Sequence, residues 1–395
     1  MLKLVAALLF ACTLSACASD KSLNFACDRF KQFRTEIPPT PGDGAGQAGG
    51  TASIVSPSAL SELLGKSLKP FPDALTSGAV GNARNILILS GGGQWGAYGA
   101  TYLRGWSQHG GTGDAARPKA FDVVTGVSTG ALQATFAFLG SDFDENLVEA
   151  YTIKDEKELV DRYGSLFFLS HGSMADIAPL ETYIRAKLRP LLDKVAAEPE
   201  NRQLFVGTVD GLDGKMYAID LTRIARELKG PEREQCYVGA LLASAAVPVV
   251  FRQLTISGHP YLDGGVRHSV FVTQFEHAAG QRLEAGGIKG NLYIVVNGDP
   301  TPAAVEALPA KLLPTINRLR SIVFNQVEMS SIYGAASQYP GLRTRITNAA
   351  GNRCNAKPDE EAEIFSPTVM RCLRDYGDER WKIGSPWVEY HMPQK

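Results

Sequence analysis

A serine stands between two glycines in the segment Gly126-Val127-Ser128-Thr129-Gly130. The strand-like segment Phe121-Asp122-Val123-Val124-Thr125 precedes it, and a mostly apolar run over residues 131–139 follows it. A strand, a Gly-x-Ser-x-Gly segment and a helix in this order are the context of a nucleophile elbow, a sharp turn that exposes the serine hydroxyl beside a helix N-terminus. The pattern predicts Ser128 as the nucleophile of an acyl-transfer reaction, and glycines on both sides relieve crowding at the turn.

A second candidate site is the segment Gly91-Gly92-Gly93-Gln94-Trp95-Gly96, which follows the apolar run 86–89. Unpaired amides at a helix N-terminus bind negative charge, and glycines let a ligand come close to them. The segment also fits the dinucleotide-binding pattern, which expects an acidic residue about 20 positions later, after a second strand. Asp114 stands near that distance but in a glycine-rich turn. The cofactor interpretation is therefore weak, although the glycines alone do not decide the ligand.

A nucleophilic serine needs a base. The chain has 6 histidines, none of them framed by glycines. The segment Tyr261-Leu262-Asp263-Gly264-Gly265 offers a carboxylate instead, and it follows a run of small residues, 243–248, that ends at a proline. Taken alone, an aspartate before two glycines is also typical of a simple turn.

Along the chain, the four segments stand in the order glycine loop, Gly-x-Ser-x-Gly, small-residue run and Asp-Gly-Gly. In this order they resemble the patatin-like phospholipases, over residues 85–338. The resemblance implies a three-layer α/β/α fold with a mostly parallel central sheet. It also implies a serine hydrolase that cleaves fatty-acyl esters of lipids with a Ser–Asp dyad and no cofactor. The residues that it assigns are Ser128 as nucleophile, Asp263 as proton acceptor, the amides of Gly91, Gly92 and Gly93 as oxyanion hole, and Gly96, Gly126, Gly130, Gly264 and Gly265 as motif glycines.

Two positions depart from the family's pattern. Members often carry Asp before the three glycines and Arg or Lys two places after them, where this chain has Ser90 and Trp95. Without a cation beside the loop, recognition of a lipid phosphate there is less expected. The sequence leaves open whether the substrate is a phospholipid or a neutral acyl ester.

The composition fits an ordinary globular protein, with 44% hydrophobic and 21% charged residues. A formal net charge of −1 gives no basic field for nucleic acid. Cysteines and histidines do not cluster as zinc ligands do, so we expect no catalytic metal. Strand-like and helix-like runs alternate along the chain, which predicts an α/β domain with a largely parallel sheet. The predicted strands are 86–89, 121–125, 204–209, 216–219 and 292–296, and the predicted helices are 97–106, 131–139, 179–192, 222–228, 239–246 and 318–334.

The first 16 residues combine one lysine, an apolar run and small residues, which is typical of a secretory signal. They lead into Leu14-Ser15-Ala16-Cys17, which resembles the lipobox of bacterial lipoproteins. The resemblance implies lipidation of Cys17 and a place in the bacterial cell envelope. Ala18 is not the aspartate that typically retains lipoproteins in the inner membrane, so it implies the outer membrane. We expect a signal over residues 1–16, a tether over 17–80 with one short helix near 58–65, a patatin-like domain over 81–345 and a polar extension over 346–395.

The cysteines suggest two disulfides. Cys12 leaves with the signal and Cys17 is lipidated, so four cysteines remain for an oxidising compartment. Cys354 and Cys372 close a short loop in the polar tail, and we pair them as a hypothesis. Cys27 and Cys236 then pair by elimination, although four cysteines allow three pairings.

Two other functions stay open from the sequence. One is a histidine-dependent α/β hydrolase that uses Ser128, an acid and a histidine such as His268 or His277. The other is a non-catalytic envelope lipoprotein that binds anions with its glycine loop. A dense apolar cluster at 166–169 could line an acyl groove, act as a lid or simply pack in the core. The sequence does not indicate an oligomeric state.

Overall fold

The computed structural model describes residues 23–37, 84–163, 173–271, 290–300, 312–338, 342–357, 360, 363–382 and 386–389. The signal, Cys17, the helix expected near 58–65, the cluster at 166–169 and His277 lie outside the described residues.

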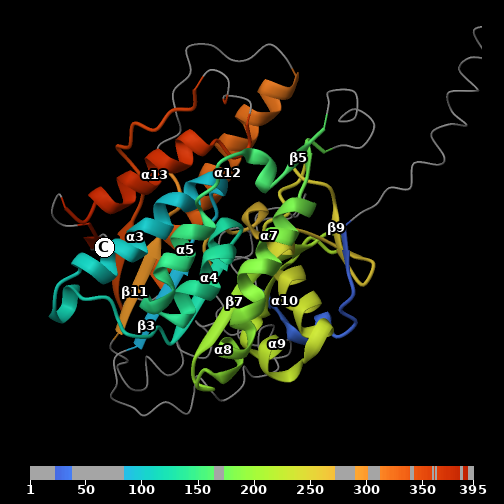
Figure 1. Ribbon diagram of the computed structural model, residues 1–395, viewed down its shortest axis with the longest axis horizontal. Helices are drawn as coiled ribbons and strands as arrows, with labels where there is room; N and C mark the ends of the chain where they lie inside the picture. Colours follow the sequence, from blue (N-terminus) through green and yellow to red (C-terminus); the bar gives the residue numbers. More distant parts are fainter. Residues whose placement is uncertain are drawn as a thin grey trace, which may run out of the picture.

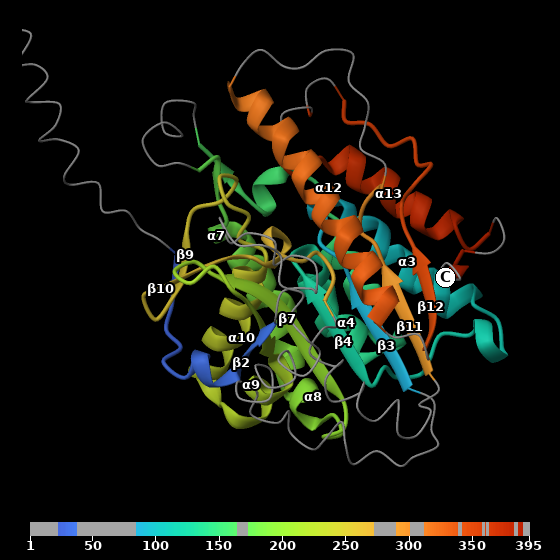
Figure 2. The same cartoon turned by 180° about the vertical axis from the view of Figure 1, so that it is seen from behind.

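A mixed sheet, with eleven strands among the described residues, organises the protein (Figures 1 and 2). Its centre is the run β7-β4-β3-β11-β12, in which every neighbouring pair is parallel. The strands are β1 (Leu23–Phe25), β2 (Arg34–Ile37), β3 (Arg84–Leu89), β4 (Val123–Val127), β7 (Gln203–Asp210), β8 (Met216–Asp220), β9 (Leu254–Ile256), β10 (His259–Asp263), β11 (Gly290–Val295), β12 (Leu342–Thr347) and β13 (Val388–Glu389). A separate short pair joins β5 (Asp161–Arg162) to β6 (Ala175–Asp176).

Helices cover both faces of this sheet. Figure 1 shows α3, α4, α7 and α10 on one face, and Figure 2 shows α12 crossing the opposite face. The helices are α3 (Gly96–His109), α4 (Thr129–Leu139), α5 (Asp144–Ala150), α7 (Ala178–Leu188), α8 (Leu192–Ala197), α9 (Leu221–Glu227), α10 (Gly230–Ser244), α12 (Leu312–Gln338) and α13 (Pro367–Glu379). None of the described helices is both long and apolar enough to cross a membrane.

Strand β3 shows why the sheet is buried on both faces. Leu87 and Leu89 belong to the larger core, together with apolar residues of α3 and α4. Ile86 and Ile88 point the other way, into a second core that includes Ile332 of α12. Successive side chains of a strand alternate between faces, so a run of aliphatic residues fits only a strand covered on both sides. This arrangement is a three-layer α/β/α fold, as predicted.

The elements predicted between residues 86 and 334 are all present. The two ends differ from the expected division. β1 and β2, in the expected tether, pair with β9 and β8 and extend the sheet. β12 crosses the expected boundary at residue 345, and α13 packs along α3. Both ends of the chain are mostly polar, so the sequence did not reveal the short strands β1 and β2 or the helix α13, which buries only one of its faces. These elements add apolar residues to a core that the central part of the chain forms.

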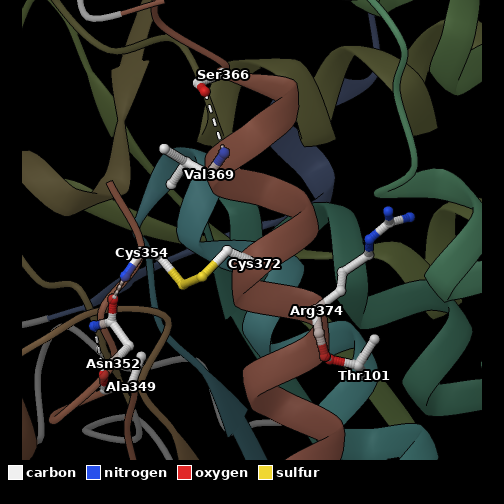
Figure 3. Close-up of a disulfide and its surroundings, with 8 residues drawn as sticks. All are labelled: Thr101, Ala349, Asn352, Cys354, Ser366, Val369, Cys372 and Arg374. Atoms are coloured by element: carbon white, nitrogen blue, oxygen red, sulfur yellow. Dashed lines mark hydrogen bonds between the residues drawn. A yellow bond between two sulfur atoms is a disulfide. The ribbon is translucent and has the colours of Figure 1, made fainter. Parts of the chain in front are cut away.

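Both expected disulfides are present. Cys27 bonds to Cys236 of α10, which fixes the segment after β1 against the main body. Cys354 bonds to Cys372 of α13, and Figure 3 shows this bond joining the loop around Asn352 to the helix. Thr101 of α3 donates a hydrogen bond of 2.7 Å to the carbonyl of Arg374 in α13 (Figure 3). The described part of the C-terminal region, with α13 against α3, is therefore packed onto the domain and is not a separate extension.

Candidate active site

Ser128 lies at the turn between β4 and α4, where it is buried. Its backbone has φ 54° and ψ −123°, a conformation that costs free energy for a residue with a side chain and that is typical of functional turns. A Cβ on Gly126 would lie 2.4 Å from the carbonyl oxygen of Gly130, and one on Gly130 would lie 2.1 Å from that of Leu89. The turn closes only because both positions are glycine.

The C-terminal end of α10 holds this turn in place. The amide of Ser128 donates to the carbonyl oxygen of Ser244 at 3.1 Å and to its Oγ at 3.0 Å. The Ser244 hydroxyl donates in turn to the carbonyl of Gly207 in β7, at 2.6 Å. Two residues later, the carbonyl of Ala246 accepts a 3.0 Å hydrogen bond from the amide of Asp263. One helix end therefore fixes the backbones of the predicted nucleophile and the predicted base.

Asp263 ends β10 and is 1% exposed. Its Oδ1 accepts a hydrogen bond of 2.7 Å from the amide of Gly265, whereas Oδ2 is buried and has no hydrogen-bond partner of good geometry among the described residues. Burial raises the pKa of Asp263 to about 7, because the charged form loses its hydration. The Ser128 hydroxyl and the Gly265 amide lower this pKa and so limit the shift. The carboxyl is therefore a much better proton acceptor than an exposed aspartate.

The glycine loop, Gly91 to Gly93, lines the same cavity as Ser128 and Asp263. Gly92 has φ 149°, and a Cβ there would lie 1.7 Å from the carbonyl oxygen of Asn297, so no other residue fits. The amide of Gly91 is already engaged, since it donates to the carbonyl oxygen and the Oγ of Ser269 at 3.3 and 3.2 Å. Among the described residues, no acceptor bonds the amides of Gly92 and Gly93. The sequence predicted three amides as donors to an anion. In the structure, only those of Gly92 and Gly93 have no acceptor among the described residues.

The remaining motif glycines allow close packing around the site. A Cβ on Gly96 would lie 2.2 Å from Oγ1 of Thr129, where α3 begins against α4. A Cβ on Gly264 would lie 2.4 Å from the carbonyl oxygen of Gly207, and one on Gly265 would lie 3.0 Å from Oδ1 of Asp263.

A buried glutamate of α12 fixes the loop from the other face of the sheet. Oε1 of Glu328 accepts hydrogen bonds from Ser90 at 2.9 Å and from Ser269 at 3.4 Å. Burial raises the pKa of Glu328 to about 7, although the two hydroxyls lower it. Ser269 also accepts the hydrogen bond from Gly91, so the carboxylate supports the loop through both serines. Sequence analysis missed Glu328, because it lies 238 residues from Ser90 in a helix of ordinary composition.

Asn297 is the second residue that sequence analysis missed. Its Nδ2 donates to the carbonyl oxygen of Ser90 at 2.8 Å and to Oε1 of Gln133 at 2.9 Å. Its backbone amide donates to Oγ of Ser90 at 2.9 Å. Ser90, which stands where the family often has Asp, thus connects the loop to β11 and α12.

These groups open into one cavity of about 570 Å³, which Ser128, Asp263, the three glycines and Trp95 line. One wall is apolar and comes mainly from α4, α7, the segment after α10 and the segment before α13: Leu132, Phe136, Leu180, Ile184, Leu188, Val247, Val250, Phe251, Ile364 and Phe365. The other wall comes from α12 and carries Arg320, Ser321, Phe324, Asn325 and Glu328. An apolar cavity with a few converging polar groups is typical of a site for an organic ligand.

No histidine that the structure describes lines this cavity. His268 lies next to Ser269 but is not part of the wall, and His259 pairs with Asp210 at 2.6 Å. The described residues also contain no group of three or more His, Cys, Asp or Glu side chains that could hold a metal ion.

Comparison with known proteins agrees with this geometry. Residues 87–275 match the family model of the patatin-like phospholipases. The chain carries a patatin-like phospholipase domain. The matched segment includes the glycine loop, the elbow, the end of α10 and the Asp-Gly-Gly turn. The family supports a lipid acyl hydrolase activity for this domain in general.

Similarity to other proteins is low. No curated protein sequence matches this chain. Among solved structures, the crystal structure of VipD from Legionella pneumophila is similar at 12% sequence identity and a TM-score of 0.35. That similarity covers 74% of this chain and 67% of the VipD chain.

Two of the buried acids, Asp263 and Glu328, make the stability of the protein depend on pH. The folded pKa values of Asp263 and Glu328, about 7 each, lie above the ordinary values of 3.8 and 4.5. The folded state therefore binds more protons than the unfolded state between roughly pH 4 and pH 7, and the free energy of unfolding falls as the pH rises through this window.

We expect the Asp263 carboxyl to titrate near pH 7, and to titrate higher still in Ser128→Ala, which loses the hydroxyl that lowers this pKa. The measurement is carboxyl carbon NMR on protein labelled at aspartate and glutamate. Two controls remove other buried carboxyls with a raised pKa from the spectrum: Glu328→Gln and Asp220→Asn. An Asp263 carboxyl that titrates near pH 4 in the folded protein would contradict the burial that the structure assigns to it.

Proposed function

We propose that this protein is a serine acyl hydrolase that cleaves fatty-acyl esters of lipids with Ser128 as nucleophile and Asp263 as general base. The observation that carries the proposal is that a strained, cavity-facing serine and a buried carboxyl with a pKa of about 7 are held by the same helix end. A base near neutral pKa suits proton transfer at physiological pH.

In the first step, Oγ of Ser128 attacks the ester carbonyl carbon and its proton passes to Oδ2 of Asp263. Negative charge develops on the carbonyl oxygen, where the amides of Gly92 and Gly93, which no acceptor in the described part of the chain engages, can donate. Loss of one such preorganised donor costs roughly 3 to 4 kcal/mol of transition-state stabilisation in other hydrolases.

The tetrahedral intermediate then collapses. The bond to the leaving alcohol breaks and protonated Asp263 returns the proton to that oxygen, which leaves an acyl group on Ser128. Water attacks the acyl-enzyme, Asp263 takes the proton from the water and returns it to Ser128, and the fatty acid is released. A carboxyl group is a weak base for this task, and its reaction suits esters better than amides, whose leaving group needs stronger acid help.

The apolar wall supports an acyl chain as the group that enters the cavity. Its residues lie on the side of α4 and α7, next to the elbow. A buried hydrocarbon chain gains about 0.8 kcal/mol for each methylene removed from water. Trp95 adds apolar surface at the loop, where the family often has a cation.

We expect a fluorophosphonate to label the wild-type protein at Ser128, and we expect Ser128→Ala to abolish the labelling. Asp263→Asn should lower kcat for a p-nitrophenyl ester by at least a thousandfold, because the serine then has no proton acceptor. The wild-type kcat/KM should rise with pH through about 7, as Asp263 loses its proton.

The matched control is His268→Ala, in the neighbouring turn but off the cavity wall. Activity that is lost in His268→Ala but kept in Asp263→Asn would favour a histidine-dependent hydrolase. A folded wild-type protein that is not labelled at all would leave only an anion-binding module.

We also propose that a lipid on Cys17 holds the mature protein at the bacterial outer membrane, near its substrate. The support is the sequence of the first 17 residues. Globomycin should cause the unprocessed precursor to accumulate, and Cys17→Ser should give a protein that takes up no labelled palmitate. Normal processing in the presence of globomycin would contradict the anchor.

A further inference from the structure

Arg320 is the side chain on the cavity wall that no contact explains. It is half-buried, and it makes no hydrogen bond or ion pair with any residue that the structure describes. The carboxylates that share the wall, Asp263, Asp299 and Glu328, form no ion pair with it. Burial alone lowers the pKa of Arg320, with no neighbouring charge contributing. A guanidinium stays charged under these conditions.

Its position relative to the reacting groups follows from helix geometry. Arg320, Phe324 and Glu328 are spaced by four residues, so they lie on one face of α12, and that face forms the cavity wall. Glu328 bonds Ser90 beside the glycine loop. A Cβ on Gly265 would lie 3.3 Å from the Phe324 ring, which places this ring next to the Asp263 turn. Arg320 is thus about 12 Å along the helix axis from Glu328, the residue that bonds Ser90, with Phe324 between them.

The two walls of the cavity differ in character. The apolar wall comes from helices on one face of the sheet, whereas α12 crosses the other face (Figures 1 and 2). A substrate with its ester at Ser128 and its acyl chain along the apolar wall has the rest of the molecule beside α12. No described carboxylate that lines the cavity forms an ion pair with Arg320, so a ligand that carries an anionic group can pair with it.

An unpaired, half-buried cation is costly for the free protein. Withdrawing it from water loses hydration that none of the described carboxylates replaces. A bound anion would offset that cost, and a guanidinium binds two oxygens of a phosphate at once, because its N–H groups form a planar fork. The glycine loop has Trp95 where the family often has a cation. The charge absent from the loop is present on the opposite wall.

We propose that Arg320 is a specificity-determining residue that binds the phosphate of a glycerophospholipid substrate while its acyl ester lies at Ser128. This inference rests on the proposed hydrolase function. It selects phospholipids over neutral acyl esters, and it assigns the headgroup to α12 and the acyl chain to the wall of α4 and α7.

The test compares phosphatidylglycerol with diacylglycerol of identical acyl chains, both in the same neutral detergent micelles. Hydrogen bonds to charged groups contribute about 1.5 to 3 kcal/mol, so Arg320→Gln should lower the ratio of kcat/KM for phosphatidylglycerol over diacylglycerol by about ten- to hundredfold. Arg320→Lys should recover part of the ratio, because it keeps the charge but not the fork. The matched control is Arg318→Gln, two residues earlier on α12 and off the cavity wall, which should keep the wild-type ratio. An unchanged ratio in Arg320→Gln would overturn the proposal.

A binding measurement separates this proposal from the hydrolase proposal. Ser128→Ala protein is titrated with a non-hydrolysable diether phosphatidylglycerol and with the matching diether glycerol, in the same micelles. We expect tighter binding of the phosphate-bearing ether, and we expect Arg320→Gln in the Ser128→Ala background to remove the difference. Equal binding of both ethers would overturn the Arg320 site even if the enzyme hydrolyses esters. Inorganic phosphate that binds as tightly as the diether phospholipid, through Arg320, would overturn the headgroup assignment in favour of a free-anion site.

Discussion

The C-terminal end of α10 fixes the relative position of Ser128 and Asp263, the two groups proposed to carry the chemistry. The carbonyl and the hydroxyl of Ser244 both accept a hydrogen bond from the amide of Ser128. The carbonyl of Ala246 accepts one from the amide of Asp263. The Ser244 hydroxyl is itself held by Gly207 of the central strand β7. The elbow follows β4 and the aspartate ends β10, and both strands pair with β7, so the sheet brings the two turns to one edge. The helix end then fixes the two backbones relative to each other. The small residues before Pro248 serve this purpose, since they let the helix end approach both turns.

Burial determines what the site can do and what it costs. Exclusion of water raises the pKa of Asp263 to about 7, which suits the proposed role as a base, and the same exclusion makes its charged form unfavourable in the folded protein. Glu328 carries a similar cost while it supports the glycine loop through Ser90 and Ser269. Arg320 adds a charge of opposite sign on the same wall. Helix α12 thus brings a carboxylate and a guanidinium to a cavity whose loop lacks the ionic residues that the family often has there.

The sequence predicted most of the central fold, and the structure brings the two side chains proposed to react, Ser128 and Asp263, to one cavity. Strand β3 could be predicted because aliphatic residues occupy both of its faces. The elbow could be predicted because the tight turn accepts only glycine on both sides of Ser128, and this requirement leaves the Gly-x-Ser-x-Gly pattern in the sequence. Both disulfides were also predicted. The pairing of β1 and β2 with the sheet could not be predicted, since short edge strands carry little periodic signal.

The groups that support the site from a distance were missed for a related physical reason. Glu328 and Asn297 act through contacts with residues far away in the chain, and nothing in their neighbouring residues indicates those contacts. Arg320 was missed because its place on the cavity wall follows only from how α12 packs. Gly91 shows that a recognised motif can also mislead. The sequence motif included its amide among the anion donors, but in the structure that amide already donates to Ser269.

The most direct test of this account is a crystal structure of the protein after reaction with a fluorophosphonate that carries a medium-length alkyl chain. The account predicts a phosphorus bond to Oγ of Ser128, with the phosphonyl oxygen on the amides of Gly92 and Gly93 and Asp263 beside Oγ. The amide of Ser128 should remain on Ser244, and the alkyl chain should lie along the wall of α4 and α7. An adduct whose phosphonyl oxygen points away from the glycine loop, or whose nearest base is a histidine, would contradict it.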